Sequence, residues 1–253
     1  MIRVEELTKR YGAVTALDGV TFQVGPGEVV GVLGPNGAGK STLFRILSSW
    51  LAPDSGRARV LGFDTVEEAL EVRRRIGYLV EHNALYESMR VGDYLEFTAR
   101  MRGLAGSRLR DRIEHVARVC DLQPVLRRRI QDCSKGNRQR VGVAAAIVHD
   151  PPVLILDEPT HGLDPIQVAS FLEFVRSLRA ERAVLFSNHV LAEVTAVSDR
   201  LLVLLGGRLV ADEAIPTLRE REAEAGGSLD ELLVRLVREA AEYQSAAAEG
   251  RTP

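Results

Sequence analysis

A glycine-rich segment, residues 34–42, restricts the possible folds of this chain more than any other part of the sequence. It reads Gly-Pro-Asn-Gly-Ala-Gly-Lys-Ser-Thr and fits the phosphate-loop pattern, in which a glycine and four further residues precede Gly-Lys-Ser. The apolar run Val29–Leu33 comes before it and predicts a buried strand, and the amphipathic run 42–50 comes after it and predicts a helix. Because the pattern requires this order of strand, loop and helix, we expect a site for a nucleoside triphosphate.

The residues of this loop have separate tasks in such a site. Glycines let the backbone curl so that consecutive N–H groups surround an anion, and the positive end of the following helix points at the same place. Lys40 is expected to reach the β- and γ-phosphates, and Ser41 to offer its hydroxyl to Mg²⁺. The predicted nucleotide contacts are Gly34, Pro35, Asn36, Gly37, Ala38, Gly39, Lys40, Ser41 and Thr42.

Composition sets only broad limits. The chain has 253 residues, a net charge of −2, 45% hydrophobic residues and 27% charged residues, which gives no overall attraction to nucleic acid or membrane. It has no apolar run near the roughly 20 residues that cross a bilayer, and no hydrophobic signal region. Cys120 and Cys133 form neither a disulfide framework nor a metal cluster, so we expect a reducing, cytoplasmic compartment.

The order of apolar patterns predicts an α/β fold with a mainly parallel core sheet. Residues 1–30 show alternating patterns typical of antiparallel strands, with Tyr11 in a loop between two of them. Residues 85–150 carry successive helical patterns and no strand pattern, which indicates an all-helical insertion. Further strands of the core are predicted at 76–80, 153–156, 183–186 and 201–210.

The helical insertion is basic, because its arginines outnumber its acids. The simplest interpretation of such a face is a solvated surface. The more specific alternative is a surface that binds a partner protein or anionic lipid headgroups. Nucleic acid is disfavoured, since no aromatic residues alternate with these arginines. The residues concerned are Arg100, Arg102, Arg108, Arg110, Arg112, Arg118, Arg127, Arg128 and Arg129.

Polar side chains follow two of the predicted core strands at the point where each strand ends. Asp157 and Glu158 follow the first, and His189 follows the second. Ligands bind at the carboxyl ends of parallel strands, so Asp157 is placed to hold Mg²⁺ and Glu158 to act as general base for an attacking water. His189 is placed to bond the γ-phosphate and detect its presence. We expect Lys40, Glu158 and His189 to carry the catalysis.

A second anion site is predicted at residues 133–140, which read Cys-Ser-Lys-Gly-Asn-Arg-Gln-Arg. Ser134 is suited to cap the helix that follows, and free N–H groups beside a hydroxyl at a helix start bind anions. One chain therefore carries two half-sites for phosphate that lie far apart in sequence. Two chains placed head to tail would complete each site.

Together these segments resemble the ATP-binding subunit of an ATP-binding cassette (ABC) transporter over residues 1–215. The loop 34–42 is similar to the Walker A motif of that family, and 153–158 is similar to its Walker B motif with the glutamate. Residues 133–140 are similar to the family signature, which is usually Leu-Ser-Gly-Gly-Gln. Motifs in this order are highly specific, because the signature stands between Walker A and Walker B only in this family.

Shorter matches extend the resemblance. Gly-Leu-Asp-Pro at 162–165 is similar to the D-loop, and Ser-Asn-His at 187–189 to the switch histidine segment. Tyr11 lies where the family has an aromatic residue that stacks on adenine, and Glu81 where it usually has a glutamine that senses Mg²⁺ and the membrane partner. The resemblance thus implies further nucleotide contacts by Tyr11, Glu81, Ser134, Gly136, Asn137, Asp157 and Asp164, and metal contacts by Ser41, Asp157 and Glu81.

The family implies a P-loop NTPase of the RecA-like class that hydrolyses ATP with Mg²⁺ as a homodimer or with a paired ABC subunit. It also implies integral membrane permease subunits that dock on the helical insertion, at the inner face of the cell membrane. The signature departs from the usual one at Cys133, Lys135 and Asn137. A Ser-Lys-Gly signature with Glu81 is similar to cassettes that serve ABC-2-type export permeases, so an exporter is the leading hypothesis.

Two other functions stay open from the sequence. A non-transport ABC ATPase that acts on DNA or ribosomes usually carries a long coiled coil or two cassettes, and neither pattern occurs here. A weak ATPase that serves as a nucleotide-gated regulatory module is compatible with the altered signature.

The chain divides into an ATPase domain and a C-terminal extension. In the extension, a charged stretch with two glycines resembles a linker, and Ser-Leu-Asp-Glu at 228–231 is a capping box that starts an amphipathic helix. Its apolar face is expected to bury against its own domain or against a partner. The predicted boundaries are 1–217 for the ATPase domain (RecA-like core 1–84 and 151–217, helical subdomain about 85–150) and 218–253 for the linker and C-terminal helix.

Overall fold

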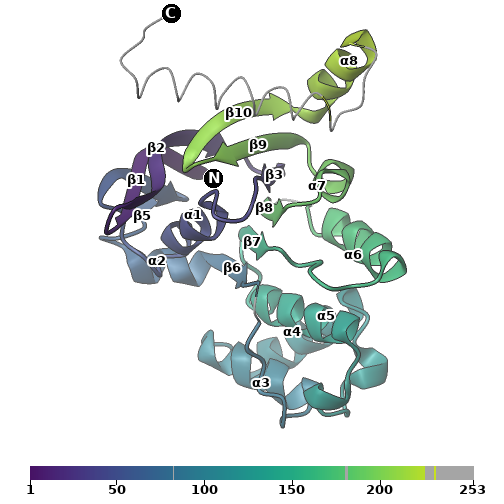
Figure 1. Ribbon diagram of the computed structural model, residues 1–253. Coiled ribbons are helices and arrows are strands. Elements are labelled where there is room, and N and C mark those ends of the chain that lie inside the picture. Colours follow the sequence, from purple (N-terminus) through teal and green to yellow (C-terminus); the bar gives the residue numbers. More distant parts are fainter. Residues whose placement is uncertain (82, 180–181, 226–230, 232–253) are drawn as a thin grey trace, which may run out of the picture.

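The structure is a computed structural model that describes residues 1–81, 83–179, 182–225 and 231 (Figure 1). The strands are β1 (Ile2–Tyr11), β2 (Val14–Val24), β3 (Val29–Leu33), β4 (Ser55–Val60), β5 (Phe63–Asp64), β6 (Ile76–Leu79), β7 (Val153–Asp157), β8 (Ala183–Asn188), β9 (Arg200–Leu205) and β10 (Arg208–Ala214). The helices are α1 (Lys40–Leu47), α2 (Ala69–Arg75), α3 (Val91–Met101), α4 (Gly106–Val119), α5 (Lys135–Ile147), α6 (Pro165–Ser177), α7 (Leu191–Val197) and α8 (Ile215–Ala225), with short 3-10 helices at Gln123–Val125 and Ile130–Asp132.

The central sheet has the strand order β10-β9-β3-β8-β7-β6. Its strands are parallel except β10, which forms an antiparallel hairpin with β9. Val153 and Ile155 belong to one hydrophobic cluster, and Leu154 and Leu156 belong to the other, because successive side chains of a strand point to opposite faces. Both faces are buried, which explains the continuous apolar run of β7. The predicted α/β class with a mainly parallel core sheet is confirmed.

The N-terminal strands form a separate antiparallel sheet with the order β2-β1-β4-β5. Helix α1 lies between this sheet and the central sheet in Figure 1. Leu43 and Phe44 of α1 are fully buried and share one hydrophobic cluster with Val4 of β1 and Val32 of β3. The loop before α1 is therefore fixed by a helix that is packed on both sides.

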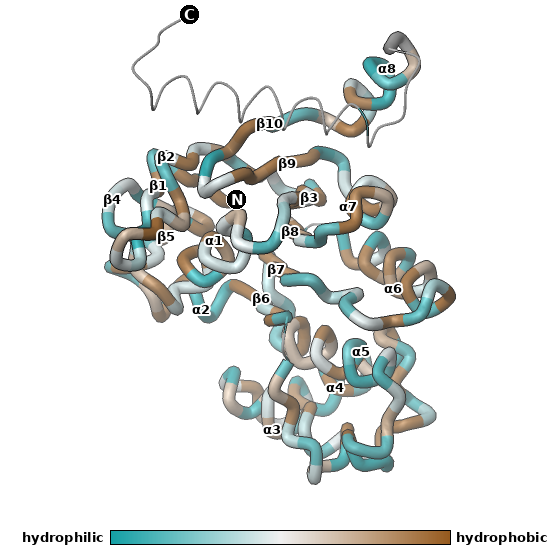
Figure 2. The backbone as a smooth tube through the Cα atoms, in the orientation of Figure 1, coloured by the Kyte–Doolittle hydropathy of each residue, from teal (hydrophilic) through white to brown (hydrophobic). Residues whose placement is uncertain are grey.

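Helices α3, α4 and α5 form the helical subdomain, which projects below the central sheet in Figure 1. Helix α5 leads back to the sheet, and its second half, from Val141 to Ile147, is buried. Gly77 of β6 allows this close packing, because a Cβ there would lie only 2.3 Å from the carbonyl oxygen of Ala146. Figure 2 shows hydrophobic residues along β9 and β10, whereas α6 alternates between hydrophobic and hydrophilic residues.

The observed elements differ from the predicted ones at several ends. Tyr11 is the last residue of β1, where it pairs with Val14, and does not lie in a loop as predicted. Helix α1 begins at Lys40 and not at residue 42, since the helical backbone starts directly at the last glycine of the loop. Helix α2 begins only at Ala69, because Asp64 accepts hydrogen bonds from the backbone N–H groups of Val66 and Glu67 in the preceding turn.

The prediction of a linker from residue 218 is wrong for its first part, because α8 occupies residues up to Ala225. Ile215 and Leu218 are buried and anchor this helix, and Arg221 pairs with Glu213 at 2.5 Å. The amphipathic helix predicted from Ser228 lies outside the described residues. Within the described residues, no helix has the length and apolar character needed to span a bilayer.

Candidate nucleotide-binding site

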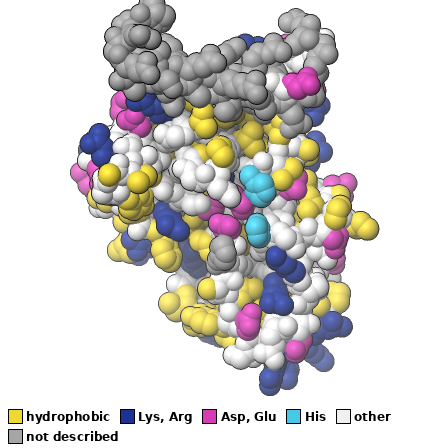
Figure 3. All heavy atoms as spheres, viewed as in Figure 1, with side chains coloured by type: hydrophobic (Ala, Val, Ile, Leu, Met, Phe, Trp, Pro, Cys, Tyr) yellow, Lys and Arg dark blue, Asp and Glu magenta, His cyan; other side chains and the backbone are white. Residues whose placement is uncertain are grey.

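Several predicted site residues meet at the carboxyl edge of the central sheet. β3 leads into the glycine-rich loop, β7 ends at Asp157, and β8 ends at Asn188. These strands are direct neighbours in the parallel part of the sheet, so their ends lie together. Figure 3 shows histidine and acidic side chains side by side in the middle of this face.

The glycine-rich loop turns sharply before α1. Gly39 adopts a φ of 107°, and a Cβ at this residue would lie 2.3 Å from the carbonyl oxygen of Ala16, so only glycine fits. The Lys40 ammonium is 5% exposed and donates to the carbonyl oxygens of Gly34 at 2.7 Å and Pro35 at 3.3 Å. A cation and the start of a helix thus face the same space, which is an anion-binding arrangement.

Both carboxylate oxygens of Glu158 are engaged by side chains of other segments. Oε1 lies 3.3 Å from the Lys40 ammonium, and Oε2 lies 3.2 Å from Nδ1 of His189. The Glu158 backbone has a φ of 44°, a left-handed conformation that is uncommon outside glycine. Glu158 therefore contacts both of the other residues expected to carry catalysis, Lys40 and His189.

Asp157 lies beside them, 2% exposed, with two hydroxyl groups around its carboxylate. Ser187 donates a hydrogen bond of 2.7 Å to Asp157, and Ser41 also bonds it. Burial raises the pKa of Asp157, and these hydrogen bonds oppose the rise. A buried carboxylate beside a hydroxyl is an oxygen donor set of the kind that Mg²⁺ prefers, so the residues present fit this ion.

Glu81 approaches the same centre from the end of β6. Oxygen atoms of Glu81 and Glu158 and a ring nitrogen of His161 lie within 4.8 Å of one another. The sequence prediction did not include His161 among the site residues, although its place between the Walker B motif and the D-loop was a usable signal.

Ser187 is a further site residue that the sequence prediction missed. Its hydroxyl is fully buried, donates to Asp157, and accepts the Glu158 backbone N–H at 3.0 Å. The pairing of β7 with β8 aligns Asp157 with Ser187, which explains this contact. Both residues follow apolar runs, so a parallel alignment of the two strand ends would have revealed the pair.

The structure places the remaining predicted residues away from this centre. Tyr11 is 46% exposed at the end of β1, whose hairpin also contributes the Ala16 carbonyl beside the glycine-rich loop. Asp164 caps α6 by accepting the Gln167 N–H at 2.9 Å. Ser134 caps α5 in the same way, accepting the Asn137 N–H at 3.2 Å.

In the signature, Ser134 is exposed, and Gly136 and Asn137 are half-buried, on the helical subdomain. Among the described residues, no hydrogen bond or ion pair joins Ser134, Gly136 or Asn137 to the glycine-rich loop. A single chain therefore brings together Lys40, Ser41, Asp157, Glu158, Glu81 and His189, and it leaves the signature apart.

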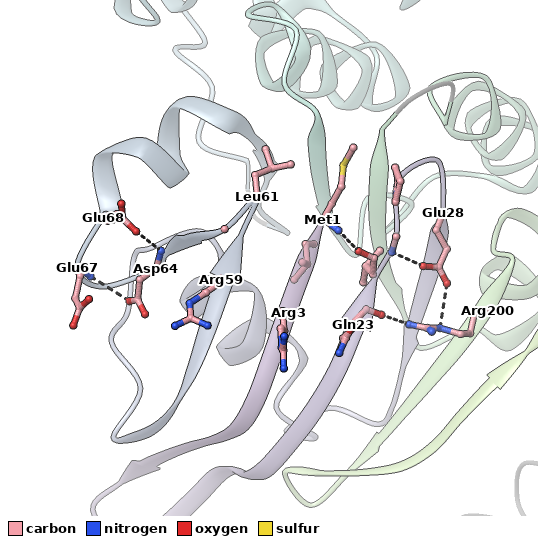
Figure 4. Close-up of a pocket in the computed structure, with 15 residues that line it drawn as sticks. Met1, Arg3, Gln23, Glu28, Arg59, Leu61, Asp64, Glu67, Glu68 and Arg200 are labelled. Carbon is pink, nitrogen blue, oxygen red and sulfur yellow. Dashed lines mark hydrogen bonds and ion pairs between the residues drawn. The ribbon is translucent and has the colours of Figure 1, made fainter.

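A cavity of about 1070 Å³ lies at the opposite edge of the strands (Figure 4). Several of its charged groups pair with one another or with the backbone. The Met1 ammonium donates to the Val24 carbonyl at 2.5 Å, and Arg200 contacts Glu28 at 3.3 Å. Because ligands of parallel sheets bind at the carboxyl ends of the strands, this cavity is not the nucleotide site.

Many arginines of the helical subdomain have partners in their own chain. Arg100 pairs with Glu96 at 2.7 Å, Arg118 pairs with Glu114 at 2.9 Å, and Arg112 donates to the Val148 carbonyl. These contacts reduce the free positive charge that the sequence alone suggests.

Comparisons with known proteins agree with this geometry. Residues 17–161 match the family model described as ABC transporter. The chain is 42% identical over 235 residues to the daunorubicin resistance ATP-binding protein DrrA3 of Streptomyces coeruleorubidus, covering 92% of this chain and 73% of that protein. It is 37% identical over 228 residues to the ABC transporter ATP-binding protein NatA of Bacillus subtilis, covering 88% and 93%.

A solved structure of an ATP-binding subunit of an ABC transporter superposes on the fold with a TM-score of 0.82 and 32% identity, covering 93% of this chain and 99% of that one. The family match extends from before the Walker A loop to beyond Glu158. The chain therefore belongs to the ABC transporter family as an ATP-binding subunit, and it is an ATPase.

Proposed function

We propose that this subunit powers an ABC-2-type exporter through ATP-driven closure of a head-to-tail dimer, with Glu158 as general base. The supporting observation is that both Glu158 oxygens contact Lys40 and His189, the two side chains placed to bind a γ-phosphate. A γ-phosphate competes with Glu158 for both partners. When they turn to the phosphate, the carboxylate is free to accept a proton from the attacking water. The base is thus available only when a triphosphate is bound.

The other site residues bind and orient the nucleotide in this proposal. The backbone of 34–39 and Lys40 surround the phosphates, and Tyr11 stacks on the adenine. Asp157 and Ser41, with Glu81 at the rim, hold Mg²⁺. When bound, Mg²⁺ adds positive charge that stabilises the transferred phosphoryl group.

The exposed signature supports the dimer. Ser134, Gly136 and Asn137 lie at the start of α5, where the helix dipole favours an anion. In a head-to-tail pair they bind the nucleotide held by the partner, and Asp164 lies at the same junction. Each nucleotide is then enclosed by two subunits.

An exposed apolar surface supports docking of a membrane permease on the helical subdomain. Tyr86 is 55% exposed, and its ring packs edge-on against Phe97 at 5.6 Å, while Met101 on the same helix as Phe97 is 72% exposed. Hydrophobic side chains gather at the lower left of the helical subdomain in Figure 3. Such patches mark interaction sites. In this proposal the patch meets the permease, and the subunit works at the inner face of the membrane.

The relative DrrA3 is named for daunorubicin resistance, which supports export of a small molecule as the transport direction. In this proposal the cargo is bound by the permease, and this subunit supplies the energy. Reconstitution of the subunit with its permease in vesicles tests the direction, because an exporter moves cargo away from the side that holds this chain and ATP, whereas an importer moves cargo toward that side.

The test of the site is the variant Glu158→Gln with Glu173→Gln as matched control, since Glu173 is an exposed acid on α6. Glu158→Gln should bind ATP, lower kcat by about 10²–10⁴-fold, and accumulate a dimer with ATP and Mg²⁺ that light scattering detects. Glu173→Gln should hydrolyse ATP like the unmodified chain. Hydrolysis by Glu158→Gln near the unmodified rate would show that Glu158 is not the general base. If Glu158→Gln stays monomeric with ATP and Mg²⁺, the proposed dimer is wrong.

A further inference from the structure

A buried polar network joins the segment after β7 to the segment after β8. Thr160 is 5% exposed and Asn188 is 2% exposed, and Glu193 reaches both from the first turn of α7. The Thr160 hydroxyl donates to Oε2 of Glu193 at 2.6 Å. The Asn188 side-chain amide donates to the same oxygen at 2.7 Å and to the Thr160 hydroxyl at 2.7 Å. One carboxylate thus holds two polar groups that come from different loops.

The Asn188 side chain has only one orientation that satisfies all its contacts. Its Oδ1 accepts the backbone N–H groups of His189 at 2.7 Å and Val190 at 3.1 Å. A flipped amide would place its NH₂ group against these two donors and its oxygen against the Glu193 carboxylate. The network therefore fixes the backbone of the switch histidine and does not only fill space.

Both ends of the network adjoin residues placed at the reacting phosphate. His189 follows Asn188 directly, and Glu158 lies two residues before Thr160 in the same turn. The two side chains touch each other at 3.2 Å although they belong to separate loops. Their relative position depends on what joins the loops, and hydrogen bonds to a carboxylate are the stronger kind of such links.

We propose that Glu193 is a positioning residue for ATP hydrolysis, which sets the switch histidine against the catalytic base through Asn188 and Thr160. It contacts neither nucleotide nor water in this role. The inference rests on the proposed roles of Glu158 and His189. When His189 leaves Glu158 for a γ-phosphate, the network keeps both backbones in place, so that only side chains move.

The experiment compares Glu193→Ala, Glu193→Gln and the exposed control Glu173→Ala in the full chain. For each we measure kcat, the affinities for ATP and ADP by calorimetry, and the melting temperature. Glu193→Ala should lower kcat by about 10–100-fold, because misplacement of a reacting group by about 1 Å has effects of this size. The affinity for ADP should stay within about twofold, since the loss concerns γ-phosphate contacts.

Glu193→Gln keeps an oxygen that accepts both hydrogen bonds, so it should recover most of the lost kcat. Glu193→Ala with unchanged kcat would overturn the proposal. A parallel loss of ADP affinity and melting temperature without recovery in Glu193→Gln would also overturn it, because this describes general damage. If Glu193→Ala does not fold, Thr160→Val decides, since it removes two hydrogen bonds of the network, one donated to Glu193 and one accepted from Asn188, at nearly constant volume and should lower kcat alone.

Glu158→Gln separates this inference from the proposed function. If Glu158→Gln is inactive and Glu193→Ala is fully active, the site assignment stands and the positioning role is wrong. If Glu158→Gln remains active, the assignment of the base fails first.

Discussion

Removal of the Ser187 hydroxyl should disturb both acids at the end of β7 at once. This hydroxyl donates to Asp157 at 2.7 Å and accepts the Glu158 backbone N–H at 3.0 Å, inside a fully buried site. In Ser187→Ala, that N–H loses its acceptor, which costs about 1–3 kcal/mol, and a hydrogen bond to a carboxylate is lost as well. We expect a decrease of about 2–4 kcal/mol in the free energy of unfolding.

Urea unfolding and steady-state ATP hydrolysis check this prediction. Ser48→Ala is the matched control, because Ser48 is 2% exposed and its hydroxyl only donates to the Arg45 carbonyl at 3.2 Å. The control should lose less than about 1.5 kcal/mol and keep its activity. Ser187→Ala should also lower kcat by about 10–100-fold, since the left-handed backbone of Glu158 loses its support. Equal stability and equal kcat in the two variants would refute this reasoning.

Two further predictions concern Lys40 and His149. Lys40→Ala should abolish ATP binding, because no other cation in the described site contacts Glu158 and the Gly34 carbonyl together. Calorimetry measures the affinity for ATP, and an unchanged affinity would contradict the assignment of the phosphate loop. Burial lowers the pKa of His149 from 6.5 to about 4, so its contribution to stability is present above pH 6.5 and is lost as the pH falls toward 4. The matched variant is His149→Gln, which keeps a donor for the Ile76 carbonyl. Relative to it, the unmodified chain should lose about 2 kcal/mol of its free energy of unfolding between pH 7 and pH 5, as measured by urea unfolding at each pH. An equal change of this free energy with pH in both proteins would count against burial of the neutral ring.

The sequence was sufficient for the phosphate loop, the core strands and the polar residues that follow them. The apolar part of β7, residues 153–156, was recognisable because a strand buried on both faces is apolar throughout, and this property is local. The sequence predicted that Glu158, Lys40 and His189 lie at the same edge of the sheet, but it did not predict their direct contacts. Their direct pairing depends on side-chain geometry between three strand ends, which no local pattern contains.

The features that sequence reasoning missed depend on tertiary contacts. Asn188 and Glu193 are ordinary polar residues in the sequence, and only the approach of α7 to the Walker B turn makes them a network. Helix α8 was taken for a linker because its charged residues show no apolar stripe, whereas two buried side chains, Ile215 and Leu218, suffice to anchor it. Tyr11 was placed in a loop because it stands beside Gly12 between two strand patterns, whereas in the structure it extends β1 and pairs with Val14.

The packing of α5 has a mechanical consequence for the signature. Its first turn carries Ser134 at an exposed end, while its second half is clamped against β6 where Gly77 meets Ala146. Because the second half of α5 is held against β6, Ser134 shifts only when the whole helix tilts about this contact. Enlarging Gly77 would therefore displace the distant serine. In the proposed dimer, a protein that docks on α3 or α4 acts on the nucleotide through the same contact between α5 and β6.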